Sequence, residues 1–173
     1  MSGAAKEQID LIVDSREQSP FVFDPAVFNV ARGTLKLADY AVAGMQDRAA
    51  IERKSLSDLL GCIGGSRPRF ERELAGLSKL DFAAVVIEAG IVDVLGDGYR
   101  SSISPAAVMG SCAAWSVRYR VPFYFCGSRH HAQLWTAHLL RRLALDERRR
   151  VEEVTAAASM IAEELAAAAK GAQ

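Results

Sequence analysis

The sequence predicts a mixed three-layer α/β domain that is followed by a C-terminal helical tail. Its 173 residues are the usual length of one domain, and half of them are hydrophobic, which is enough to bury a core. Short apolar runs typical of strands are interspersed with segments of helical periodicity. Towards the C-terminus the composition becomes rich in Ala and Glu. We therefore predict a flexible N-terminus over 1–8, a folded domain over 9–147 and a helical extension over 148–173.

Five segments are predicted strands because they are apolar and are bounded by polar or turn residues. They are 9–13, 35–43, 49–53, 82–88 and 121–126. A Gly-containing turn at 44–47 indicates that the second and third form a hairpin. The fourth is apolar almost throughout, as expected for a strand that is covered on both faces.

Four helices are predicted where capping residues or chain breaks precede segments with one apolar face. They begin at Ser55, after the Gly-Gly-Ser-Arg-Pro break at 64–68, at Ser104-Pro105 and at Ser128. The second of them presents Phe70, Leu74 and Leu77 on one face. This alternation of strands and helices is what favours a sheet between two helical layers.

Charge and cysteine content exclude several classes of protein. Lys plus Arg equals Asp plus Glu, at 21 each, so any nucleic-acid surface must be a local patch. Cys62, Cys112 and Cys126 lie far apart without zinc-ligand spacing, so we interpret them as packing residues of a protein in a reducing compartment. No apolar run reaches the roughly 18 residues of a membrane span. We expect a soluble, cytoplasmic protein.

Charged residues at the end of the third predicted strand are the strongest sign of chemistry. Strand alternation sends Glu52 and Lys54 to the same face, and the hairpin brings Asp39 towards Glu52. Two carboxylates suit Mg²⁺ or Mn²⁺, and a lysine beside them can act on an attacking water. An isolated Glu and Lys on an edge strand would more often be simply solvated. On an exposed face, these charges would contribute little to stability.

Three longer motifs contain these residues. They are Val13-Asp14-Ser15-Arg16-Glu17, then Ala38-Asp39-Tyr40, then Glu52-Arg53-Lys54 followed by Asp58. Their order and content resemble the XPF-type structure-specific endonucleases, within the PD-(D/E)XK nuclease superfamily. Ala38 replaces the glycine of the second motif, a change that keeps every charged group. The resemblance runs from residue 9 to about residue 145.

The resemblance implies a restriction-endonuclease-like α/β/α nuclease domain that hydrolyses phosphodiester bonds of branched or junction DNA, in DNA repair or recombination. Asp39 and Glu52 would hold the metal, and Lys54 would orient or activate water. The remaining motif residues would complete the catalytic site; they are Asp14, Arg16, Arg53 and Asp58. Arg16 or Arg53 would place a guanidinium on the phosphate. The family also implies a homodimer or heterodimer through the nuclease domain.

Several of these residues have a plainer interpretation. Asp58 can be the third residue of a capping box that starts at Ser55, and Glu17 can simply pair with Arg16. Arg53 can point away from its two neighbours by strand alternation. A basic stripe is a candidate DNA contact or a solvated helix face. It comprises Arg67, Arg69, Arg72 and Lys79.

Beyond the domain, apolar residues recur at alternating steps of three and four. They are Val151, Val154, Ala158, Ile161, Leu165 and Ala168. This pattern predicts a helix with a narrow seam that rests on its own domain or on a second copy. The segment is too short for the tandem helix-hairpin-helix module of many family members, so we expect DNA binding through the nuclease domain, a dimer of it or a partner. Two alternatives to an active nuclease are a catalytically silent partner subunit and an assembly protein.

Overall fold

The computed structural model of the chain describes residues 8–96 and 101–171. Within these ranges one sheet is formed by the strands β1 Ile9–Asp14, β2 Phe28–Gly33, β3 Tyr40–Val42, β4 Ala49–Lys54, β5 Phe82–Ile87 and β6 Phe123–Phe125. Their order across the sheet is β2-β1-β3-β4-β5-β6. β1 is parallel to β2 and antiparallel to β3, β3 is antiparallel to β4, and β5 is parallel to β4 and β6. The predicted hairpin, β3 with β4, is therefore confirmed.

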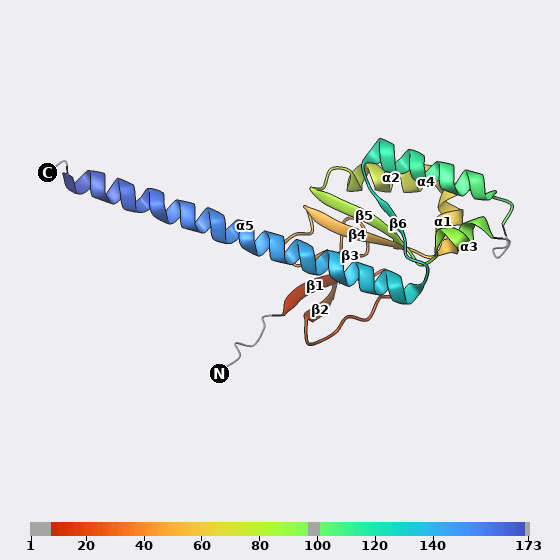
Figure 1. Cartoon of the computed structure of the whole chain (residues 1–173), viewed down its shortest axis with the longest axis horizontal. Coiled ribbons are helices and arrows are strands. Elements are labelled where there is room, and N and C mark those ends of the chain that lie inside the picture. Colours follow the sequence, from red (N-terminus) through yellow and green to blue (C-terminus); the bar gives the residue numbers. More distant parts are fainter. Residues whose placement is uncertain (1–7, 97–100, 172–173) are drawn as a thin grey trace.

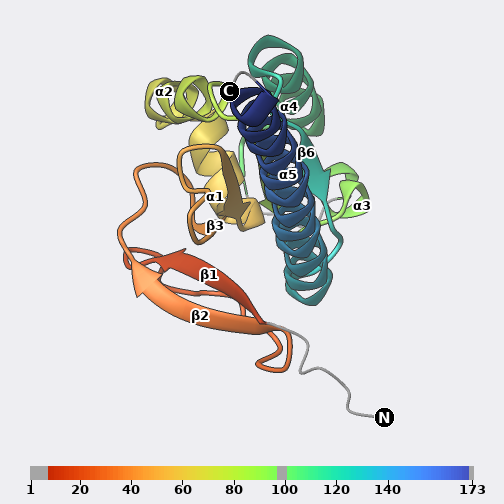
Figure 2. The same cartoon turned by 90° about the vertical axis from the view of Figure 1, so that its left-hand side faces the viewer.

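Helices cover both faces of this sheet (Figures 1 and 2). They are α1 Leu56–Ile63, α2 Arg67–Leu77, α3 Ile91–Leu95, α4 Pro105–Tyr119 and α5 Arg129–Gly171. Residues of α1, α2 and α4 share one hydrophobic core with one face of the sheet, and residues of α5 share a second core with the other face. The three-layer α/β/α architecture predicted from the sequence is confirmed.

β5 connects the two cores because its side chains alternate between the faces. Val85 and Ile87 belong to the core beneath α1, α2 and α4, whereas Ala84 and Val86 belong to the core beneath α5. All four side chains are fully buried. This explains the uninterrupted apolar run in the sequence, which a strand covered on one face would not need.

The strand predicted over 35–43 is wrong at its N-terminal half, since only Tyr40–Val42 is extended. The Leu35 amide donates a 2.7 Å hydrogen bond to Asp14 Oδ2 and so is drawn away from a sheet ladder. Ala38 has a φ of 61°, in the left-handed region that glycine adopts most easily. The family motif has glycine at this position, and the backbone conformation explains why.

Two elements were absent from the sequence-based prediction. β2 is an edge strand with four consecutive exposed residues, so it lacks the alternation that identifies a half-buried strand. α3 has only five residues and buries one of them, Val94. The last strand is also shorter than the predicted 121–126. These elements depend on tertiary pairing more than on local pattern.

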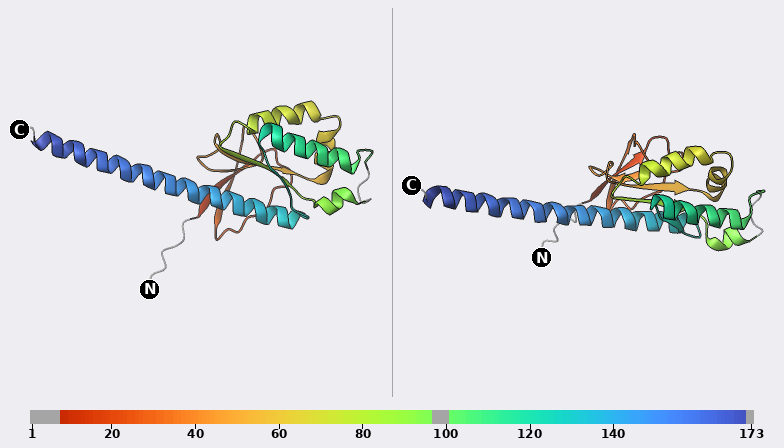
Figure 3. Two further views of the ribbon diagram at one scale, coloured as in Figure 1. Left: turned by 45° about the horizontal axis from the view of Figure 1, so that its top comes forward. Right: turned by 90° about the horizontal axis from the view of Figure 1, so that it is seen from above.

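α5 is one helix of 43 residues, roughly 65 Å long at 1.5 Å per residue. The Ser128 hydroxyl caps it by accepting from the His131 amide, and Ala132, Leu140 and Ala144 are buried against the sheet. From Val151 to residue 167 every residue is exposed, and the helix projects away from the domain (Figures 1 and 3). The predicted helix is confirmed there, but the alternative that it rests on its own domain is wrong. No helix among the described residues is both long and apolar enough to cross a membrane.

Candidate functional site

A cavity of about 850 Å³ lies where the C-terminal ends of β1 and β4 meet α1 and α2. It is lined by all seven residues that the sequence predicts to form the catalytic site, which are Asp14, Arg16, Asp39, Glu52, Arg53, Lys54 and Asp58. The fold therefore gathers three motifs that are separated along the chain. Strand ends and the loops after them bring side chains to one edge of the sheet while their backbones remain in the ladder.

Asp39 lies directly before β3 and is held by hydrogen bonds to two neighbouring strands, β1 and β4. Its amide donates to the Ile51 carbonyl at 3.1 Å, and its carbonyl accepts from the Asp14 amide at 2.8 Å. Its side-chain Oδ2 accepts from the Arg53 amide at 2.8 Å. Burial nevertheless raises the pKa of Asp39 to about 6, because a single hydrogen bond does not replace the lost hydration.

Glu52 is a buried carboxylate that forms an ion pair with Lys54, as strand alternation predicted. Burial raises the pKa of Glu52 well above its usual value; Lys54 opposes this shift, and Asp39 adds to it. Burial alone would lower the pKa of Lys54, but the charges of Glu52 and Glu73 outweigh it, so the amine stays protonated. The Lys54 amine also lies 5.1 Å from the centroid of the Phe70 ring. The expectation that these charges lie on an exposed face is wrong.

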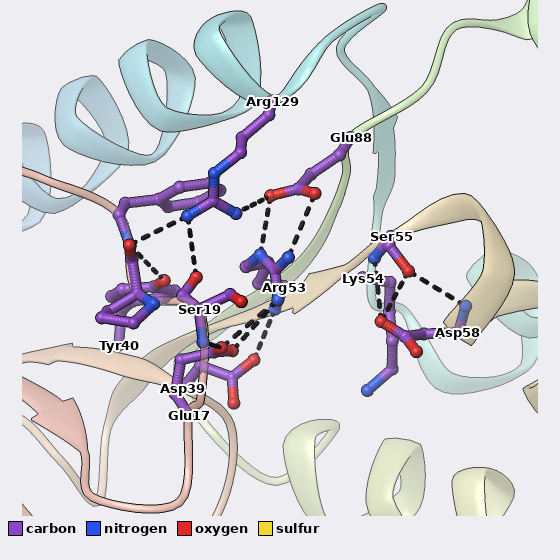
Figure 4. Close-up of polar contacts among 12 residues, drawn as sticks. Glu17, Ser19, Asp39, Tyr40, Arg53, Lys54, Ser55, Asp58, Glu88 and Arg129 are labelled. Atoms are coloured by element: carbon purple, nitrogen blue, oxygen red, sulfur yellow. Dashed lines mark hydrogen bonds and ion pairs between the residues drawn. The ribbon is translucent and has the colours of Figure 1, made fainter.

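Arg53 points away from Lys54, as strand alternation also predicted (Figure 4). Its guanidinium forms a bidentate pair with Glu88, with Nε–Oε1 at 2.7 Å and Nη2–Oε2 at 3.1 Å. Its third nitrogen lies 3.3 Å from Glu17 Oε1. Glu17 thus pairs with Arg53, and the interpretation that it pairs with Arg16 is wrong.

Asp14 lines the cavity, and both of its carboxylate oxygens accept hydrogen bonds. Arg16 donates to it from its amide and from its guanidinium, at 2.8 Å to Oδ1 and 3.0 Å to Oδ2. These bonds, chiefly the one from the Arg16 side chain, lower the pKa of Asp14 to about 2. The Arg16 side chain remains 68% exposed, so it can also meet a solvent-borne anion. Asp14 therefore orients Arg16.

Asp58 completes the capping box at the start of α1. Its carboxylate accepts from the Ser55 hydroxyl at 2.6 Å, and its amide donates to the same hydroxyl at 3.1 Å (Figure 4). The capping interpretation is therefore confirmed, and Asp58 also lines the cavity. A cap of this kind fixes the direction in which the chain leaves β4.

The predicted basic stripe divides between two surfaces. Arg69 and Arg72 are exposed on α2 and line the cavity. Arg67 lies elsewhere, because its guanidinium stacks 4.8 Å from the Trp115 ring centroid and donates to the Ser111 hydroxyl. Lys79 is exposed beyond the end of α2 and does not line the cavity.

Three acidic or basic residues near the cavity were not singled out by the sequence. Glu73 of α2 lines the cavity, although its position on a mixed-charge helix face gave no signal. Glu88 accepts hydrogen bonds from both Arg53 and Arg129, and Glu88 and Arg129 are 41 residues apart in the sequence. Glu88 did carry a signal, since it is the charged residue that ends a buried strand, as Lys54 does for β4.

The sequence matches one protein-family model, and the fold is similar to that of solved structures. The family model of the ERCC4 domain matches residues 13–139. The fold is similar to that of XPF from Aeropyrum pernix, with a TM-score of 0.59, 21% identity, and coverage of 76% of this chain and 60% of that chain. It is also similar to XPF from Aeropyrum pernix in complex with DNA, with a TM-score of 0.58, 19% identity, and coverage of 83% and 66%.

The chain spans less than two thirds of those two XPF chains, and the identities are low enough that the likeness is one of fold. A search of curated proteins gave no significant match. The ERCC4 match carries the assignment because it covers most of the chain, including all three charged motifs and the cavity that they line. The chain therefore belongs to the ERCC4-domain family, as an XPF-type nuclease domain.

Proposed function

We propose that this chain is a metal-dependent DNA endonuclease whose catalytic groups for phosphodiester hydrolysis are Asp39, Glu52 and Lys54. The observation that carries the proposal is the convergence of the buried Glu52, the half-buried Asp39 and one lysine at a solvent-connected cavity in an ERCC4 domain. Buried carboxylates that repel one another are unfavourable for folding, so their presence in a cavity favours a functional reason.

Asp39 and Glu52 are the residues that would hold Mg²⁺ or Mn²⁺. Hard oxygen donors suit these ions, and burial raises the pKa values of both carboxylates, so a cation bound between them would favour their charged forms. Mg²⁺ usually keeps several of its waters and needs only one or two protein carboxylates. Such an ion supplies Lewis-acid polarisation of the phosphodiester.

The protein's own side chains would position the substrate. Lys54 is protonated and held by Glu52, so it can donate a hydrogen bond to an attacking water or to a phosphate oxygen, but it does not serve as a base. Arg16 has the exposed, oriented guanidinium that suits a bridging contact to phosphate. Arg69 and Arg72 on the cavity wall would contact the DNA backbone, with Arg67 and Lys79 as more distant candidates.

The substrate class that we propose is branched or junction DNA, in repair or recombination. Its support is membership of the ERCC4-domain family. A similar solved structure is XPF from Aeropyrum pernix in complex with DNA. We also propose a cytoplasmic location, which follows only from composition.

The chain would work as a homodimer or heterodimer through its nuclease domain. The exposed face formed by β6, α3 and the start of α5 supports this proposal, since it has an apolar cavity of about 380 Å³. Trp135 is 42% exposed there, and Ile91 is 46% exposed. A large apolar patch on a folded domain commonly marks a protein interface.

The alternative function is a catalytically silent partner subunit of the same fold. All charged motif positions are filled and lie at one cavity, which favours the active form. The test is incubation of purified protein with Mg²⁺ or Mn²⁺, and in parallel with EDTA, on end-labelled single-stranded, duplex, flap, fork and nicked DNAs. Metal-dependent cleavage of junction substrates is expected. Binding without cleavage under every metal condition would favour the silent subunit.

A further inference from the structure

Four charged side chains of alternating sign connect four segments beside the proposed active site (Figure 4). Glu17 comes from the loop after β1, Arg53 from β4, Glu88 from the residue after β5, and Arg129 from the first residue of α5. Arg53 lies between the two carboxylates, and the Arg129 guanidinium donates to Glu88 Oε1. The side chains of Glu17, Arg53 and Glu88 are only 8–11% exposed, whereas that of Arg129 is 43% exposed. Arg129 therefore closes a nearly buried cluster from the solvent side.

Arg129 also holds the loop between β1 and β2. Its Nη2 donates to the carbonyls of Ser19 and Pro20, both at 2.9 Å, and its guanidinium lies 5.1 Å from the centroid of the Phe21 ring. A planar guanidinium can make all these contacts at once, whereas an ammonium group lacks the fork. The first residue of α5 thus fixes a loop that is more than 100 residues earlier in the chain.

The same cluster reaches the proposed metal ligands through the backbone of β4. The Arg53 amide donates to Asp39 Oδ2, and the Arg53 side chain is held by Glu88. The orientation of Asp39 therefore depends on the position of Arg53. Glu17 in turn accepts from the Ser19 amide at 2.6 Å, and its neighbour Arg16 lines the cavity. Displacement of the loop would therefore move Arg16 relative to the two carboxylates.

We propose that Arg129 and Glu88 are positioning residues, which hold Arg53 and the loop over residues 15–20 in register with the catalytic groups. The proposal rests on the proposed nuclease function for its kinetic consequence, and on geometry alone for its structural consequence. It assigns to α5 a role in the site, although no residue of α5 lines the cavity. Neither residue touches the reacting atoms, so both act through Arg53 and the loop.

The test compares Arg129→Ala, Arg129→Lys and the control Arg142→Ala in the full chain. Arg142 lies on the same helix, is 72% exposed and pairs only with the exposed Asp146 among the described contacts, so its substitution removes a similar charge without touching the cluster. Three quantities are measured: the single-turnover cleavage rate at saturating DNA well below the unfolding temperature, Mn²⁺ affinity by electron paramagnetic resonance, and amide hydrogen exchange. The exchange measurement follows the Ser19 and Phe21 amides, which are bonded to Glu17 and to the Tyr40 hydroxyl.

We expect Arg129→Ala to lower the cleavage rate roughly 10- to 100-fold, the scale produced by small misplacement of catalytic groups. Arg129→Lys should lose less, and Arg142→Ala should match the wild type. Exchange at Ser19 and Phe21 should accelerate in Arg129→Ala while the amides of β5 stay protected, and Mn²⁺ affinity should change little because both ligands remain. A purely stabilising ion pair would lower the unfolding temperature without changing the rate per folded molecule.

An unchanged cleavage rate in Arg129→Ala, or unchanged exchange at Ser19 and Phe21, would overturn the proposal. The two failures separate cleanly. If the wild type cleaves no DNA, the proposed function fails, while the exchange measurement still decides whether Arg129 holds the loop. If the wild type cleaves and Arg129→Ala cleaves equally well, only the positioning role fails.

Discussion

Substitution of Asp39 by Asn should stabilise the metal-free protein at neutral pH while abolishing cleavage. The carboxylate is half-buried, and desolvation raises its pKa from 3.8 to about 6. An amide side chain has nearly the same shape, and its oxygen can still accept from the Arg53 amide. The substitution therefore removes the unfavourable charge and keeps the hydrogen bond. A residue retained at the expense of stability is what an active site often contains.

The sign of the pH dependence follows from proton linkage. Below pH 3.8 both the folded and the unfolded chain bind this proton, so Asp39 has no effect on the free energy of unfolding. Between pH 4 and pH 6 the unfolded chain loses the proton first, so the folded state becomes progressively less stable as the pH rises. Above pH 6 the full penalty is present. A shift of about 2 pKa units corresponds to about 3 kcal/mol, which for a chain of this size is roughly 6–12 °C in unfolding temperature.

Thermal unfolding followed by circular dichroism in EDTA measures this effect. Asp39→Asn should unfold at a higher temperature than the wild type at pH 7.5, and the difference should vanish near pH 4. Adding Mg²⁺ should raise the unfolding temperature of the wild type by preferential binding to the folded state, and should leave the variant nearly unchanged. Asp47→Asn is the matched control, because Asp47 is exposed in the turn between β3 and β4.

An Asp39→Asn variant that is no more stable than the wild type at pH 7.5 would show that the charge of Asp39 does not destabilise the folded state. Stabilisation that persisted undiminished at pH 4 would have a cause other than the charge. Stabilisation by Asp47→Asn of the same size would indicate a general effect of net charge. Equal stabilisation of wild type and variant by Mg²⁺ would place the ion elsewhere.

Three further outcomes are expected. Lys54→Met should lower the free energy of unfolding by about 3 kcal/mol at pH 8 in urea titrations, because it leaves Glu52 buried without its cation. The double variant Lys54→Met with Glu52→Gln should recover most of this loss. Ser55→Ala should lower the free energy of unfolding by about 1 kcal/mol through loss of the α1 cap; no change would show that the cap is dispensable. In light scattering the full chain should be a dimer, and a chain that ends at Arg150 should associate more weakly because it lacks the exposed apolar seam of α5. A monomeric full chain at micromolar concentration would contradict both the dimer and the role of the seam.

Much of the layout was predictable because local patterns identify buried strands and capped helices. The apolar run of β5, the hairpin of β3 with β4, and the Ser55 and Ser104 caps all correspond to the structure. The site residues were predictable as a set because three motifs contain them. Local pattern did not predict the edge strand β2, which has few buried residues. It also did not predict the irregular backbone before Asp39, where Ala38 adopts a left-handed conformation.

The electrostatics of the site were beyond the reach of the sequence for a different reason. Arg53 pairs with Glu88, and Glu88 with Arg129, across 35 and 41 residues, so these pairs exist only once the sheet order is known. The sequence likewise suggested an exposed Glu52, whereas its side chain is buried near the end of β4. Burial turns Glu52 and Asp39 from surface charges into groups whose pKa values are raised, and that difference supports a metal site.

Glu52, with Asp39 and Lys54, is proposed to form a metal-dependent hydrolytic site. The most direct test is the Mg²⁺-dependent single-turnover cleavage rate of a flap or nicked DNA by Glu52→Gln, which keeps the size of the side chain and a hydrogen-bond acceptor for Lys54. The rate should fall on the order of 10²–10³-fold, the loss seen when one preorganised electrostatic group is removed from an active site, with DNA affinity retained. A Glu52→Gln variant that cleaves at the wild-type rate would show that Glu52 takes no part in catalysis.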